Sequence, residues 1–129
     1  MPAFIATLAV MAVLDGLWLG LVARSFYRQH LGFLMAESPN WVAAGAFYII
    51  YAIGVTVFAT APGVEEGSAL AAAWRGAMFG FVAYATYDLT NMATLRGWPT
   101  IVTIVDMAWG TALSAAVAGL AAFLVLQLT

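Results

Sequence analysis

Four apolar stretches, each close to the length that crosses a bilayer, organise this sequence of 129 residues. They cover roughly residues 3–23, 41–60, 70–93 and 101–126. A helix needs about 20 apolar residues to cross the hydrocarbon core, and four spans are too few to close a β-barrel. The sequence therefore predicts an all-α integral membrane protein. We expect a single domain, residues 1–129, folded as an antiparallel four-helix transmembrane bundle.

The composition excludes several classes of protein. Only 8% of the residues are charged and 65% are hydrophobic, whereas soluble domains carry about 25% charged residues. Without cysteine, the chain has no disulfide, no thiolate metal site and no cysteine nucleophile. A net charge of −2 with four arginines and no lysine excludes a nucleic-acid-binding surface.

The charged residues between the stretches predict an orientation. Arg24 and Arg28 follow the first stretch and Arg96 follows the third, while the second connection carries Glu65 and Glu66. The positive-inside rule places the first and third connections in the cytoplasm and both termini on the non-cytoplasmic side. No basic residue precedes the first stretch, so we expect a retained span rather than a cleaved signal peptide.

Three aspartates lie inside the apolar stretches: Asp15, Asp88 and Asp106. An ionisable group at the centre of a span costs about 2.5–3.5 kcal/mol on insertion scales, so such groups normally face inward and find partners. At about 1.5 Å per residue, all three lie in the cytoplasmic half of the membrane, within roughly 10 Å of one another in height. We therefore expect one shared polar site.

Aromatic and amide side chains accompany these acids at helical spacing. Trp18 and Trp109 each follow an aspartate by three residues, and an indole N–H is a natural donor to a carboxylate. Gly76 and Gly80 form a small-xxx-small pair on the same side of the third stretch as Asp88, which supports an inward face. The predicted ligand-binding set is Asp15, Trp18, Tyr48, Tyr84, Tyr87, Asp88, Asn91, Asp106 and Trp109. No metal site and no catalytic residue are predicted.

Five motifs carry a family resemblance: Asp15-Gly-Leu-Trp18-Leu-Gly20, Phe47-Tyr48, Tyr84-Ala-Thr-Tyr87-Asp88-Leu-Thr90-Asn91, Trp98-Pro99 and Asp106-Met-Ala-Trp109-Gly110-Thr111. Together they resemble the bacterial family of small predicted membrane proteins catalogued as domain of unknown function 2177. The resemblance covers nearly the whole chain. It implies a four-span protein of the bacterial inner membrane and brings no activity, substrate or cofactor.

The residues favour a function in which the site binds a small ligand, a cation or a proton, because intramembrane acids commonly mark such sites. One alternative is a structural or accessory subunit of a membrane complex, in which the polar groups specify helix packing. A second is a lipid- or isoprenoid-modifying enzyme that holds Mg²⁺, although the acids lie on separate helices without a basic phosphate clamp. The expected partners are the lipid bilayer, a second copy or another subunit, and a small-molecule or lipid ligand. No histidine lies in a span to bind haem, whereas a pigment or quinone stays open as a cofactor.

Overall fold

The protein is entirely helical. The structure, a computed structural model, describes residues 1–129 and contains no strand. Its elements in chain order are α1 (Pro2–Leu17), η1 (Trp18–Val22), α2 (Arg24–Leu31), η2 (Gly32–Leu34), α3 (Trp41–Val55), η3 (Thr56–Thr60), α4 (Ala61–Glu65), α5 (Ala69–Thr94) and α6 (Thr100–Leu128).

Three continuous helical stretches are long and apolar enough to cross a membrane. They are Pro2–Val22, Trp41–Glu65 and Thr100–Leu128, with mean hydropathies of 2.1, 2.0 and 2.0. The fourth predicted span, α5, is 26 residues long. It is absent from that group because Arg75, Asp88 and several tyrosines and threonines lower its hydropathy. The all-helical, multi-pass membrane architecture is thereby confirmed, and α5 as a fourth span is taken up below as a proposal.

The connections differ from the sequence-based expectation in two places. The first connection contains a helix, α2, which was not predicted from the sequence. The second span runs on to Glu65, because Pro62 lies in the first turn of α4, where its missing N–H costs no hydrogen bond. A π-helical turn, η3, precedes that proline.

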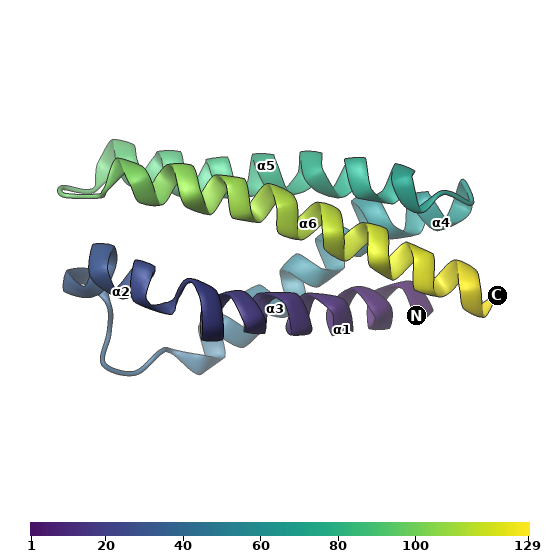
Figure 1. The fold of residues 1–129 in the computed structure, drawn as a ribbon, viewed down its shortest axis with the longest axis horizontal. Helices are drawn as coiled ribbons and strands as arrows, with labels where there is room; N and C mark the ends of the chain where they lie inside the picture. The colour runs from purple at the N-terminus through teal and green to yellow at the C-terminus, as the bar shows by residue number, and fades with distance from the viewer.

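The helices form an elongated bundle with α5 and α6 side by side (Figure 1). The helix α1 lies along the opposite side and contacts α6. In Figure 1, α3 starts near α1 and runs obliquely, so that the chain reaches α5 only at its later turns. The contacts of this second span with α5 accordingly come mainly from η3 and α4. At the end where α2 lies, α3 therefore stands apart from α5.

Glycine allows the close approach of α5 to α6. A Cβ at Gly76 would overlap the backbone carbonyl of Ser114, and one at Gly80 would overlap that of Gly110. Both glycines are buried, as is Asp88 on the same side of the helix. The predicted inward face of α5 is thus confirmed.

The apolar core lies between the middle of the bundle and the end with the two termini. Its largest fully buried side chains include Leu113, Val55 and Val117. Many apolar side chains instead cover the outside, as Leu70 and Val42 do with 79% and 84% of their surface exposed. An apolar exterior of this extent is typical of a protein surrounded by lipid.

Candidate functional site

The opposite end of the bundle holds a cavity of about 790 Å³. The three intramembrane acids line it from three different helices: Asp15 from α1, Asp88 from α5 and Asp106 from α6. The predicted convergence of the aspartates is therefore present in the structure. Other walls come from α2, from the start of α3 and from Trp98 in the turn between α5 and α6.

Asp88 is the most deeply buried of the three acids. Its exposed fraction is 0%, and neither carboxyl oxygen has a hydrogen-bond partner. Tyr84, one turn earlier on α5, makes no hydrogen bond to this carboxyl group. A buried polar group without a partner loses its hydrogen bonds to water and forms none with the protein, which costs free energy. Asp88 is thus a strong acceptor or donor left free at the cavity.

Asp106 has a partner that the sequence analysis missed. The hydroxyl of Tyr27, in α2, donates to Oδ1 of Asp106 over 2.8 Å. The indole Nε1–H of Trp18 donates to the Tyr27 hydroxyl over 3.4 Å. Burial raises the pKa of Tyr27 above its ordinary value, so the hydroxyl keeps its proton and stays a donor to Asp106. A short relay therefore joins the end of the first span to α6 through α2.

The expected pairing of each aspartate with the tryptophan three residues later is wrong. Trp18 donates to Tyr27, and its ring stacks on that of Trp109 with centroids 4.2 Å apart and an angle of 10°. The stack brings together the two helices that carry Asp15 and Asp106, and Trp109 also lines the cavity. The indoles therefore link helices instead of each serving its own acid.

The nine predicted site residues divide into three groups. Six of them line the cavity: Asp15, Tyr84, Tyr87, Asp88, Asp106 and Trp109. Trp18 lies behind the cavity wall, stacked on Trp109. Tyr48 packs against the apolar core, and Asn91 is half-buried on α5; neither lines this cavity. A ligand-binding role for these residues stays a prediction.

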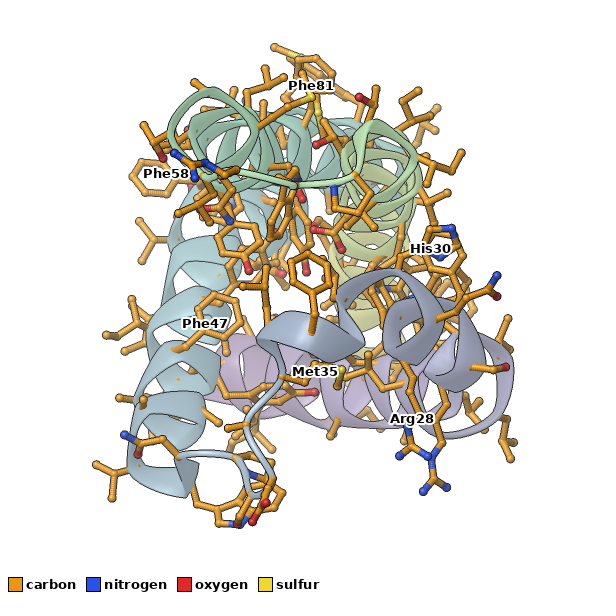
Figure 2. All side chains as sticks on the ribbon, turned by 90° about the vertical axis from the view of Figure 1, so that its left-hand side faces the viewer. Arg28, His30, Met35, Phe47, Phe58 and Phe81 are labelled. Atoms are coloured by element: carbon orange, nitrogen blue, oxygen red, sulfur yellow. The ribbon has the colours of Figure 1, made fainter.

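A face of α2 that the sequence analysis took for a polar connection contributes four lining residues. They are Arg24, Tyr27, Arg28 and Leu31. The spacing of three and four residues, which is that of one helix face, was the available signal. Figure 2 shows Arg28 pointing away from the middle of the bundle, so its charge does not face the carboxylates. Trp41 and Trp98 also line the cavity, although neither belongs to the predicted ligand-binding set.

A second, smaller pocket of about 410 Å³ adjoins the first. Phe47 and Tyr51 of α3 and Ala83 of α5 form much of its apolar wall. Phe47, Tyr84, Tyr87 and Asp106 line both spaces. The polar cavity thus continues into an apolar pocket between α3 and α5.

The acids do not converge as metal ligands do. No three acidic or histidine side chains of the chain lie close enough together to hold one ion. A ligand that contacts all three aspartates would have to extend across the cavity.

Comparison with known proteins shows a family and no closer relative. No curated protein and no solved structure matches the chain. The model of one family, described as "Predicted membrane protein (DUF2177)", matches residues 1–123. That match covers nearly the whole chain and confirms the resemblance carried by the aspartate motifs. The chain therefore belongs to the DUF2177 family of predicted membrane proteins.

Proposed function

We propose that this protein binds a small cationic ligand, or a proton, at the carboxylates that line the cavity. The observation that carries the proposal is Asp88, which is fully buried, has no hydrogen-bond partner and borders the same cavity as Asp15 and Asp106. Placing one fully buried and two half-buried carboxyl groups at one cavity costs free energy that helix packing alone does not require. A bound cation or proton lowers that cost.

The cavity walls suit an organic cation better than an anion. Its lining includes carboxyl oxygens and the rings of Tyr84, Tyr87 and Trp109. Aromatic faces attract ammonium groups, and the effect grows when the pair is removed from water. The volume of about 790 Å³ falls within the range of small-molecule sites, roughly 300–1,000 Å³.

A binding measurement with a matched pair of variants tests this function. Purified protein in phosphatidylcholine nanodiscs is titrated with propylammonium, Na⁺ or Mg²⁺, and in a separate arm it is acidified; thermal unfolding is the readout. We expect propylammonium or acidification to stabilise the wild type, and the effect to disappear in Asp88→Asn. Glu65→Gln removes an exposed carboxylate at the other end of the bundle and is expected to respond as the wild type does. Equal responses in Asp88→Asn and the wild type would refute the proposal.

We also propose that α5 is the fourth span. Its 26 residues reach about 39 Å, more than the hydrocarbon core requires. An apolar stripe runs along its outer face, with Leu70, Met78, Phe81, Val82 and Leu89 all exposed. Because α5 exposes this apolar stripe and packs along α6, its most favourable environment is the bilayer, where lipid covers the stripe.

The distribution of charge supports an orientation with the cavity near the cytoplasm. Figure 1 shows α2 and the turn between α5 and α6 at one end and both termini at the other. The first end carries Arg24, Arg28 and Arg96. At the other end Arg75 is paired with Glu66, their nitrogen and oxygen 3.3 Å apart. In a bacterial inner membrane, the positive-inside rule then places the termini on the non-cytoplasmic side.

The absence of native cysteine makes this topology simple to test. Ser25→Cys, Glu65→Cys and Leu95→Cys place single thiols at three exposed positions. A membrane-impermeant maleimide applied to intact spheroplasts should label only Glu65→Cys, and the other two only after permeabilisation. Labelling of Glu65→Cys and Leu95→Cys from the same side would show that α5 does not span.

A further inference from the structure

The small pocket next to the cavity gives information about the shape of the ligand. It lies between α3 and α5, where α3 stands apart from α5 (Figure 1). Five of its six lining residues are hydrophobic, and the sixth is Asp106. Figure 2 shows Phe47 extending from α3 toward the middle of the bundle, where it borders both spaces. One continuous space therefore has an apolar end and an acidic end.

We propose that the ligand is an amphiphile, with a primary ammonium head at Asp88 and Asp106 and an apolar chain in the pocket between α3 and α5. This proposal rests on the proposed function, since it uses the same carboxylates and adds the apolar pocket. The four residues shared by the two spaces are what join the head site to the chain site.

The chemistry of the head follows from the free oxygens. Asp88 has two buried oxygens without a donor, and an ammonium N–H supplies donors that a quaternary ammonium lacks. The apolar chain follows from the walls, because Phe47, Tyr51 and Ala83 gain from contact with hydrocarbon. Metal binding would leave this pocket unused, and the acids do not converge on one ion.

The route of entry follows from the position of the pocket. It lies between two helices whose outer surfaces are apolar, with Ile50 of α3 and Val82 of α5 68% and 60% exposed. An amphiphile in the bilayer can therefore enter sideways between α3 and α5, chain and head together. The head then meets Asp106 first, because Asp106 borders both spaces.

Three probes separate the contributions of head and chain: dodecylammonium has both, propylammonium has only the head, and dodecanol has only the chain. Binding is measured by calorimetry on protein in phosphatidylcholine nanodiscs, after subtraction of partitioning into empty nanodiscs. Ala83→Leu fills the apolar pocket, and Ala44→Leu makes the same change at an exposed position of α3 outside both spaces. Phe47→Ala removes a half-exposed ring from the pocket wall and serves if Ala83→Leu does not fold.

We expect dodecylammonium to bind the wild type about a hundredfold more tightly than propylammonium does. We expect dodecanol to bind at least about tenfold more weakly than dodecylammonium. Ala83→Leu should weaken the binding of dodecylammonium about tenfold and leave that of propylammonium unchanged. Phe47→Ala should also weaken the binding of dodecylammonium about tenfold, whereas Ala44→Leu should change the affinity for neither probe. Equal affinities for the two ammonium probes would overturn the proposal that the ligand is an amphiphile. Equal effects of Ala83→Leu and Ala44→Leu on the affinity for dodecylammonium would overturn it as well. If propylammonium binding is still lost in Asp88→Asn in that case, the proposed function stands without the amphiphile proposal. If neither ammonium probe binds, the amphiphile proposal fails, and the proposed function fails with it unless acidification still stabilises the wild type and not Asp88→Asn.

Discussion

Replacing Asp88 by alanine should stabilise the ligand-free protein, which is the opposite of what removing a buried hydrogen-bonded group does. The carboxyl of Asp88 is fully buried and unpartnered. An unsatisfied buried group costs about 1–3 kcal/mol. Deleting it leaves a slightly larger cavity, at about 1 kcal/mol per methyl-sized void. The net expectation is a gain of about 1 kcal/mol in the free energy of unfolding, together with loss of ligand binding.

Ser114→Ala is the matched control. Ser114 is also 0% exposed, and its Oγ lies 2.6 Å from the hydroxyl of Tyr51 in a buried hydrogen bond between α6 and α3. Removing the serine hydroxyl leaves that of Tyr51 unsatisfied. The cost should be about 1 kcal/mol, between the membrane average of ~0.6 for such bonds and the upper range for orphaned groups. The two variants should therefore differ by about 2 kcal/mol, with opposite signs relative to the wild type.

Unfolding of ligand-free protein by dodecyl sulfate in mixed micelles, followed by tryptophan fluorescence, measures both differences. The reasoning is refuted if Asp88→Ala loses as much stability as Ser114→Ala. That result would mean that the Asp88 carboxyl holds the helices together, and it would favour the structural role of the acids over the binding role.

Two further variants test how the site is supported. Gly80→Leu should lower the free energy of unfolding by about 3 kcal/mol, because the new side chain would overlap the Gly110 carbonyl. Gly20→Leu places its side chain in open space and should leave the free energy of unfolding unchanged. Equal unfolding curves for the two variants would contradict the close contact between α5 and α6. Tyr27→Phe removes the bond to Asp106 and should cost about 1–2 kcal/mol and raise amide hydrogen exchange across α2. Ser25→Ala, an exposed position on the same helix, should change neither quantity, and unchanged exchange in Tyr27→Phe would show that the hydroxyl does not hold α2 in place.

Three spans could be predicted from the sequence because each is an apolar stretch long enough to cross a membrane. The helix α2 could not be identified as readily, because its mean polarity resembles that of a loop. Only its spacing of Arg24, Tyr27, Arg28 and Leu31 reveals a helix face. The continuation of the second span through Pro62 also escaped prediction, since a proline after an apolar stretch more often ends a helix than begins a new turn.

The position of the three aspartates was predictable and their partners were not. Depth in the membrane follows from counting residues, so the acids could be placed at one level. Hydrogen-bond partners depend on how helices rotate and tilt against each other. Trp18 therefore reaches Tyr27 and Trp109 instead of Asp15, and Tyr48 turns to the core. Spacing along one helix is equally compatible with a Trp18–Asp15 hydrogen bond, which the structure does not contain.

The close contact between α5 and α6 leads directly into the acidic site. On α5 one row of side chains, four residues apart, runs from Gly76 and Gly80 to Asp88, and the facing row on α6 runs from Gly110 to Asp106. Because the glycines fix the separation of the two backbones, the two acids further along the same rows are held toward each other. Asp88 and Asp106 interact as like charges when both are ionised, which opposes the packing that brings them together. A sequence under selection for helix association alone would continue the small and apolar residues along these rows. The placement of two acids there is better explained by a cation or proton that completes the site.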